Sequence, residues 1–178
     1  MRKVPILSVL LLFMAGAALA QNYSRDDYGG WIDADGDCQN TRQELLIARS
    51  LMPVELDGRG CRVLSGLWVD FYSGSFVQDA TALDIDHVVA LAEAHRSGGA
   101  AWNNSAKRKF ANDQENLVIT ARQINQEKSD FDPANWMPPR PSQACSYLDK
   151  WAYIKAKWQL YMDAEEAEFI KSKRQACP

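Results

Sequence analysis

Residues 83–130 read LDIDHVVALAEAHRSGGAAWNNSAKRKFANDQENLVITARQINQEKSD, and the order of elements in this stretch decides the expected fold. Residues 83–89 and 116–120 carry runs of Val, Ile and Leu, which predict two strands. Three helices are expected, at residues 91–95, 102–111 and 122–128. The Ser-Gly-Gly of residues 97–99 ends the first of them. The order is therefore strand, helical insertion, strand, helix.

Polar side chains gather around these two strands. Asp84, Asp86 and His87 fall in the first strand, Asn116 begins the second, and Asn125 lies in the helix that follows. An imidazole titrates near pH 6.5, so His87 can act as a base at neutral pH. Asp86 and Asn125 offer carboxylate and amide oxygens, which suit Mg²⁺. Because neighbours in a regular strand point to opposite faces, Asp86 and His87 can flank one phosphate only where the strand ends.

The same stretch holds the densest group of basic residues in a chain that is acidic overall. The whole sequence has 20 Lys and Arg against 23 Asp and Glu, a formal net charge of −3. Nucleic-acid binding would therefore rest on a local patch and not on net charge. The candidates for contacts to phosphate are Lys107, Arg108, Lys109, Arg122 and Lys128. For residues 107–109 a solvated helix face is an equally good interpretation.

Three separated motifs in this stretch resemble one known superfamily. D-I-D-H-V-V, then N-L-V-I-T, then N-Q-E-K-S-D are similar in order and spacing to the HNH, or ββα-metal (His-Me finger), endonucleases. The closest likeness is to the secreted branch related to the C-terminal domain of GmrSD restriction endonucleases (DUF1524-like). The likeness also includes WIDADGDCQNTR upstream and WMPP downstream, so it covers most of the chain after residue 20.

The resemblance implies a role for each matching residue. Asp86 would bind a metal ion, and His87 would be the general base. Asn116 would tie the loop between the strands and help to orient His87. Asn125 would be the second metal ligand, where many relatives have His; an oxygen pair favours Mg²⁺, with Mn²⁺ as the alternative. Arg42 becomes a further candidate for substrate binding, because the Asn-Thr-Arg context is part of the likeness.

The first twenty residues read as a secretory signal peptide. Arg2 and Lys3 form a positive start, residues 6–13 are apolar, and Ala18-Leu19-Ala20 is a cleavage site. We expect an exported protein, periplasmic or extracellular, without a membrane span after signal cleavage. An uncleaved anchor is the alternative. Residues 21–178 would form a single nuclease domain, and no coiled-coil seam suggests anything but a monomer.

Four cysteines follow the signal: Cys38, Cys61, Cys145 and Cys177. An even number in an exported chain suggests two disulfides, for which three pairings are possible. Pairing of nearest neighbours closes loops of moderate length. A zinc site is disfavoured, because no C-x-x-C or H-x-x-x-H spacing is present.

Residues 143–177 look helical and amphipathic. One unbroken helix would hold Cys145 and Cys177 roughly 48 Å apart, which excludes a bridge between them. Asp163 followed by Glu166 resembles a capping box and offers a break. We therefore predict an antiparallel helical hairpin, at about 144–160 and 164–175. Its inner face would carry Trp151, Ile154, Trp158 and Tyr161.

The remaining segments flank this core. Residues 61–79 alternate and predict a β-hairpin, with Ser-Gly pairs at 65–66 and 73–74 as turns and with Trp68 and Tyr72 as packing residues. Residues 21–32 are a loop or a short edge strand, and the proline-rich residues 131–142 are an extended connector.

Asp33, Asp35 and Asp37, with Glu44 at the twelfth place, imitate a calcium loop. Cys38 stands where such a loop needs Gly, and no incoming helix precedes it. We favour a turn whose side chains bond nearby N–H groups and cap a helix beginning near Thr41.

The sequence thus predicts an α+β fold with a ββα-metal core, additional helices and a C-terminal helical hairpin. The expected activity is metal-dependent endonucleolytic cleavage of nucleic acid, DNA rather than RNA, with little sequence specificity. The alternative is a non-catalytic exported protein that binds calcium or nucleic acid.

Overall fold

The computed structural model describes residues 22–177, so the predicted signal peptide at residues 1–20 lies outside the described residues. Within residues 22–177 the protein is a mixture of helices and two small antiparallel sheets, which confirms the α+β class. The elements in chain order are η1 (Arg25–Tyr28), α1 (Thr41–Arg49), β1 (Glu55–Leu56), β2 (Val63–Val69), β3 (Phe76–Asp79), η2 (Ala80–Ala82), β4 (Leu83–His87), α2 (Leu91–Arg96), η3 (Gly99–Ala101), α3 (Asn104–Ala111), β5 (Leu117–Ala121), α4 (Arg122–Lys128), α5 (Pro141–Lys157) and α6 (Ala164–Arg174).

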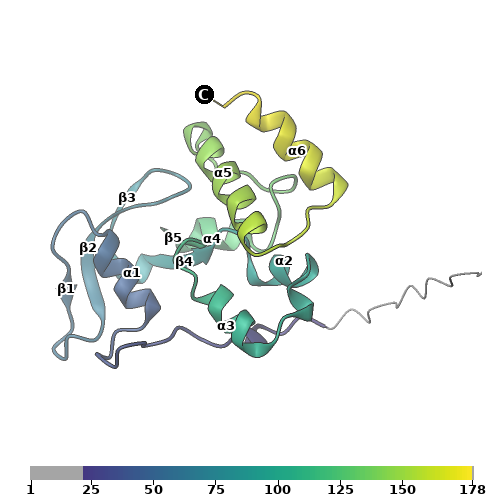
Figure 1. Ribbon diagram of the computed structural model, residues 1–178. Coiled ribbons are helices and arrows are strands. Elements are labelled where there is room, and N and C mark those ends of the chain that lie inside the picture. The colour runs from purple at the N-terminus through teal and green to yellow at the C-terminus, as the bar shows by residue number, and fades with distance from the viewer. Residues whose placement is uncertain (1–21, 178) are drawn as a thin grey trace, which may run out of the picture.

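The strands β4 and β5 form a two-stranded antiparallel sheet in the middle of the molecule (Figure 1). Its register runs without interruption from Leu83 opposite Ala121 to His87 opposite Leu117. The helix α4 begins directly after β5 and contacts both strands. The expected order of strand, helical insertion, strand and helix is confirmed, with α2 and α3 as the insertion. The strand β4 ends at His87, before the predicted end at Val89.

A second sheet has the order β1-β2-β3, and its β2–β3 hairpin confirms the one predicted from residues 61–79. The predicted turn at Ser73-Gly74 is also confirmed, since Gly74 has a φ of 70° between the two strands. The predicted turn at Ser65-Gly66 is wrong, because both residues lie inside β2. A Cβ on Gly66 would come within 2.7 Å of the Trp68 ring, so this glycine permits close packing and not a turn.

The helix α1 packs against β2 and closes one of the two apolar cores. Asn40 caps it by accepting a hydrogen bond from the Gln43 backbone N–H, as the predicted start near Thr41 requires. Trp68 is fully buried, and its indole N–H donates to the Leu46 carbonyl at 2.8 Å. Tyr72 is fully buried too, so both aromatic residues pack in the interior as predicted.

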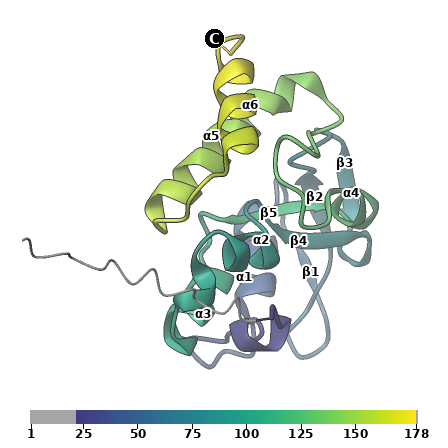
Figure 2. The ribbon, with the colours of Figure 1, turned by 90° about the vertical axis from the view of Figure 1, so that its right-hand side faces the viewer.

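The helices α5 and α6 form a hairpin that lies over α2 and the β4–β5 sheet (Figures 1 and 2). Both disulfides join nearest neighbours, Cys38 to Cys61 and Cys145 to Cys177, and the second joins α5 to the end of α6. Asp163 caps α6 by accepting from the Glu166 backbone N–H at 2.9 Å. The predicted hairpin and its break are therefore confirmed.

The inner face of the hairpin is only partly as predicted. Trp151 and Ile154 are fully buried, and Trp158 packs half-buried against the same core. The placement of Tyr161 is wrong: it is 60% exposed, because it lies in the link between α5 and α6 and not on a helix. Its hydroxyl donates instead to the backbone carbonyl of Arg96.

A buried ionic network fixes the hairpin to the rest of the molecule. Lys155 on α5 contacts Glu93 on α2 at 2.5 Å and Glu166 on α6 at 3.3 Å. Trp151 also donates its indole N–H to Glu166. Buried charges of this kind need partners on every side, so the network holds α2, α5 and α6 in one arrangement.

The segments at either end of the core follow their sequence expectations. Residues 21–32 were predicted to be a loop or edge strand; from residue 22 they form a loop with one 3₁₀ turn, η1, beside α3. In the connector of residues 131–142, Trp136 and Met137 pack against the core, and Pro141 begins α5. Within residues 22–177, none of the helices is both long and apolar enough to cross a bilayer.

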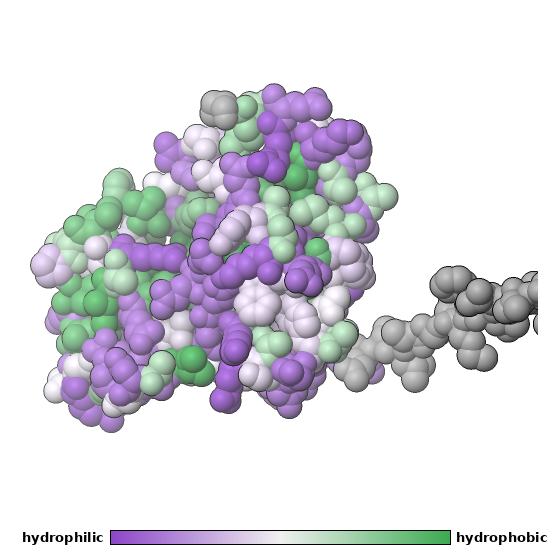
Figure 3. Space-filling model, viewed as in Figure 1, coloured by the Kyte–Doolittle hydropathy of each residue, from purple (hydrophilic) through white to green (hydrophobic). Residues whose placement is uncertain are grey.

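Exposed apolar side chains gather over the three-stranded sheet, whereas polar side chains cover much of the rest of the same face (Figure 3). The large ones in this region are Leu51, Met52, Val69 and Phe76. None of these four lines the cavity beside His87 that is described next.

Candidate functional site

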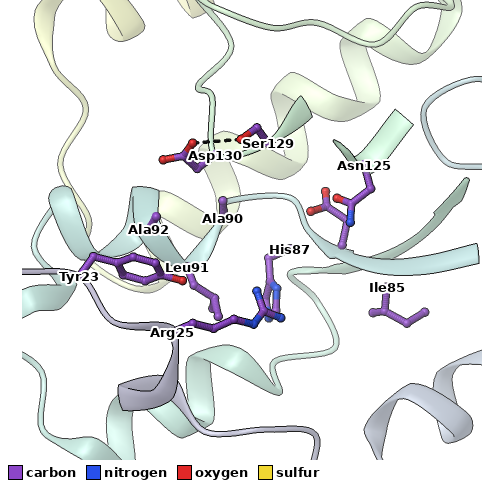
Figure 4. A pocket seen from close by; sticks show the side chains of 11 residues that line it. Tyr23, Arg25, Ile85, His87, Ala90, Leu91, Ala92, Asn125, Ser129 and Asp130 are labelled. Atoms are coloured by element: carbon purple, nitrogen blue, oxygen red, sulfur yellow. Dashed lines mark hydrogen bonds between the residues drawn. The ribbon is translucent and has the colours of Figure 1, made fainter. Parts of the chain in front are cut away.

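A cavity of about 390 Å³ opens where β4 ends, between the start of α2, the helix α4 and the N-terminal segment. Asp86, His87 and Asn125, which the sequence predicts to act together, all line it. Tyr23 and Arg25 form the opposite part of its wall (Figure 4). The fold therefore brings the predicted base and both predicted metal ligands to one cavity.

His87 is the last residue of β4, which is the position that the chemistry requires. Its Nε2 lies 2.8 Å from the carbonyl oxygen of Ala111 at the end of α3. A carbonyl oxygen only accepts hydrogen bonds, so Nε2 carries the proton and Nδ1 keeps its lone pair in the neutral ring. Trp31 stacks on the imidazole with centroids 5.5 Å apart, and the Phe110 ring is also nearly parallel to it.

Burial lowers the pKa of His87 from its usual 6.5 to about 4. Desolvation is the main cause, and the positive charges of Arg25 and Lys128 act in the same direction. The hydrogen bond to Ala111 opposes the shift. His87 is therefore neutral at physiological pH, with Nδ1 as a proton acceptor.

Asn116 is fully buried and holds the loop that follows β4. Its side-chain oxygen accepts from the Val89 backbone N–H at 2.9 Å, and its side-chain amide donates to the Val89 carbonyl at 3.0 Å. The backbone carbonyl of Asn116 accepts from the Val88 backbone N–H at 2.8 Å. These bonds fix the chain just after His87. That Asn116 orients His87, as the resemblance implies, stays a prediction.

Asp86 is almost completely buried and already has two partners. Its Oδ2 accepts from the Tyr72 hydroxyl at 2.6 Å and lies 3.0 Å from the Lys128 ammonium. Lys128 also donates to the His87 carbonyl at 2.9 Å. Burial raises the pKa of Asp86, while Lys128 and Tyr72 act in the opposite direction.

Asn125, on α4, lies next to Asp84 on β4. Its amide nitrogen donates to the Asp84 carboxylate at 3.2 Å, which leaves the amide oxygen free of protein donors among the described residues. Arg122 lies 3.6 Å from the other Asp84 oxygen. Asp84 thus orients the Asn125 amide so that its oxygen is the end available to a ligand.

The residues at this cavity fit a hard cation. Tyr72 contacts Oδ2 of Asp86 and Lys128 contacts both oxygens, so these three contacts leave about one of the roughly four lone-pair positions of the carboxylate. The free oxygen of Asn125 lines the same cavity. Two oxygen donors beside open space match the way Mg²⁺ is held, with water in its other positions.

The basic residues predicted to track phosphate do not share one surface. Lys107 is buried and pairs with Asp27 at 3.3 Å, and Lys128 is buried against Asp86. Arg42 is half-buried and donates to the Ala80 and Leu83 carbonyls. The three that remain exposed are Arg108, Lys109 and Arg122.

The acidic loop before α1 has the geometry of a turn. Carboxylate oxygens of Asp33, Asp35 and Asp37 come within 4.8 Å of one another, and all three side chains are exposed. Asp33 accepts from the Gly36 and Cys38 backbone N–H groups, and Asp37 accepts from the Gln39 N–H. These are the local bonds that the turn interpretation predicts.

Comparison with known sequences decides the family. The family model described as "GmrSD restriction endonucleases, C-terminal domain" matches residues 53–171. The chain belongs to this family. Membership in the GmrSD C-terminal-domain family indicates a nuclease-related function, with endonuclease activity and a nucleic-acid substrate.

A relative of this family member is an "Uncharacterized secreted protein" of Arthroderma benhamiae. The two are 38% identical over 157 residues, which cover 87% of this chain and 76% of the relative. The name of that relative and the two disulfides of this chain agree with export.

Some residues at the site were not predicted from the sequence. Tyr72 was assigned to packing alone, yet its hydroxyl holds Asp86. Tyr23, Arg25 and Trp31 come from a segment outside residues 53–171; the likeness WIDADGDCQNTR includes Trp31, but none of the three was assigned a role from the sequence. A contact between segments so far apart in sequence leaves no local pattern.

Proposed function

We propose that this protein is an exported, metal-dependent endonuclease of the HNH type with a ββα-metal core, built from residues 21–178 as one domain. It hydrolyses phosphodiester bonds of DNA with little sequence specificity. His87 is the general base, Asn116 orients it, and Asp86 and Asn125 are the metal ligands. Mg²⁺ is the expected cation, with Mn²⁺ as the alternative.

One observation carries this proposal. The bond from His87 Nε2–H to the Ala111 carbonyl fixes the tautomer, so Nδ1 is the basic nitrogen of a ring that lines the same cavity as Asp86 and Asn125. A histidine buried only for packing would not need Asp86 and Asn125 beside the same cavity. The family membership adds that the substrate is a nucleic acid.

The proposed reaction balances without any redox partner. Nδ1 of His87 takes a proton from water as the water oxygen bonds to phosphorus. The bond between phosphorus and the 3′ oxygen breaks, and the leaving oxygen gains a proton from solvent. A divalent cation, when bound by Asp86 and Asn125, offsets negative charge on the phosphate and on the leaving oxygen.

The described residues support weak sequence preference. Within residues 22–177 the exposed cations lie on several elements, among them α3, α4 and α6, and not on one dedicated base-reading element. Contacts to phosphate position a duplex without reading its sequence. We therefore expect cleavage at many sites.

The test is cleavage of supercoiled plasmid by the protein after removal of residues 1–20, with Mg²⁺ or with EDTA. The expected result is nicking and then degradation with Mg²⁺ and none with EDTA. Arg59→Ala, an exposed charge change in the turn between β1 and β2, serves as the control and should cleave like the parent. Plasmid and RNA that both stay intact with Mg²⁺ and with Mn²⁺ would contradict the proposal.

A further inference from the structure

The N-terminal segment, residues 22–31, completes the cavity although it lies outside the part of the chain that the family model matches. Tyr23 and Arg25 line the cavity beside His87, and Trp31 stacks on the His87 ring. A second, smaller cavity is lined by Arg25, Trp31 and His87 as well. The segment is therefore part of the site and not a tail beside it.

Buried contacts hold this segment in place. Tyr28, at the end of η1, is fully buried, and the Lys107 ammonium lies 5.7 Å from the centre of its ring. Lys107 also pairs with Asp27 at 3.3 Å. After the turn, the Ile32 backbone N–H donates to the side chain of Asn112. The position of Arg25 thus follows from the packing of η1 on α3.

Arg25 differs from the other arginines near the site. Arg42 and Arg122 each donate to backbone carbonyls, and Arg122 also lies near Asp84. Arg25 is exposed, and within residues 22–177 no carboxylate forms an ion pair with it. The Tyr23 hydroxyl lies near its guanidinium. A guanidinium that faces a cavity without a carboxylate partner is suited to bind an anion.

The orientation of the side chain agrees with this. Figure 4 shows Arg25 extending from the N-terminal segment toward the His87 ring, with Asn125 farther along the same cavity. A phosphate beside His87 in this cavity would therefore meet both a guanidinium and the predicted metal ligand. A guanidinium matches two phosphate oxygens at once, which a lysine cannot do.

We propose that Arg25 is a catalytic residue that binds the non-bridging oxygens of the phosphate attacked beside His87. This inference rests on the proposed nuclease function, because the phosphate is that of the same substrate. It gives the N-terminal segment a direct part in the reaction. It also means that residues 53–171 alone lack one charge of the complete site.

The first measurement is steady-state cleavage of a DNA duplex with Mg²⁺ by Arg25→Ala, Arg25→Lys and Arg59→Ala. Arg59 lies exposed in the turn between β1 and β2, so Arg59→Ala makes the same charge change away from the cavity. Arg25→Ala should lose on the order of 10²-fold in kcat, as for other charged or oxyanion-binding donors. Arg25→Lys should recover part of this loss, and Arg59→Ala should stay within about twofold of the parent.

The second measurement does not depend on cleavage. Binding of a fluorescent duplex is followed in EDTA over a range of salt concentrations. Loss of one phosphate contact should reduce the slope of log K against log salt by about 1 in Arg25→Ala only. If the parent protein does not cleave but this slope changes as stated, the nuclease function fails and the phosphate site stands. Equal kcat values and equal slopes for Arg25→Ala and Arg59→Ala would overturn the inference.

Discussion

Three buried contacts decide what the Asp86–His87 pair can do. The Ala111 carbonyl fixes the proton on His87 Nε2, and Lys128 with Tyr72 holds the Asp86 carboxylate. Neighbouring side chains in a regular strand point to opposite faces. Asp86 and His87 can line the same cavity because His87 is the last residue of β4, where the chain leaves the strand. Their chemistry therefore depends on the end of the strand as much as on residue type.

The lowered pKa of His87 predicts a specific dependence of stability on pH. Its pKa is about 4 in the folded state and near 6.5 when unfolded, so between these values the unfolded chain binds more protons. Its share of the free energy of unfolding is complete above about pH 6.5 and is lost as the pH falls toward 4, up to about 3 kcal/mol. In His87→Gln, the part of the acid-induced loss in the free energy of unfolding that comes from His87 should disappear.

Urea unfolding in EDTA at several values between pH 4 and pH 7.5 measures this. Other groups titrate alike in both proteins, so the difference between the two curves isolates His87. Parallel curves for the parent and His87→Gln would show that His87 is not held neutral by burial.

Lys128 was predicted from sequence to contact the substrate, whereas the structure places it against buried Asp86. Lys128→Met should therefore destabilise the protein by about 3–5 kcal/mol, because it leaves a buried carboxylate without its cation. Tyr72→Phe, which removes one hydrogen bond to Asp86, should cost about 1–3 kcal/mol. Lys109→Met is the matched control on an exposed site and should change stability by less than about 0.5 kcal/mol.

Thermal and urea unfolding compare the three variants. If Lys128→Met unfolds like Lys109→Met, and only the binding of DNA is weaker, then Lys128 is a surface contact and its burial against Asp86 is wrong. The sequence does not separate these cases, because the burial of a lysine depends on which elements pack over it.

Most elements of this fold follow from local patterns. The strands around residues 83–89 and 116–120, the helix after them and the break near Asp163 were all predicted, since periodicity and caps act over a few residues. The turn predicted at Ser65-Gly66 was wrong, because the sequence does not distinguish a glycine that makes room for Trp68 from a glycine in a turn. The placement of Tyr161 on the inner face was wrong, because α5 ends at Lys157, earlier than its apolar pattern suggested.

The C-terminal hairpin offers a prediction at the level of elements. The Cys145–Cys177 bridge joins residues 32 apart and ties the end of α6 to α5. Replacing both cysteines by serine should lower the free energy of unfolding by about 2–4 kcal/mol, mainly by freeing the unfolded chain. Lys155, buried between Glu93 and Glu166, should keep the hairpin docked, so cleavage activity should persist at low temperature.

Differential scanning calorimetry and a cleavage assay at 20 °C check both parts of this prediction. The Cys38–Cys61 double serine variant is a control, since its bridge joins residues 23 apart in a different region. A double variant at 145 and 177 with unchanged stability, or one that loses cleavage while still folded, would contradict the assigned role of the bridge.

At the scale of the whole molecule, the site is assembled from three distant parts of the chain. The β4–β5–α4 unit supplies the predicted base and metal ligands, α3 supplies the carbonyl that sets the His87 tautomer, and the N-terminal segment supplies Arg25 and Trp31. Only the first part was predicted, because it lies within one continuous stretch of sequence. The other two depend on how α3 and η1 pack, which no local motif encodes.

The proposed function depends above all on activation of water by His87 for hydrolysis of a phosphodiester. The most direct measurement is the rate of cleavage of a DNA duplex with Mg²⁺ by the parent protein and by His87→Ala, together with the chemistry of the new ends. We expect 5′-phosphate and 3′-hydroxyl ends, and a loss of about 10²–10⁴-fold in kcat for a His87→Ala protein that remains folded. A His87→Ala protein that cleaves at nearly the parent rate would contradict it.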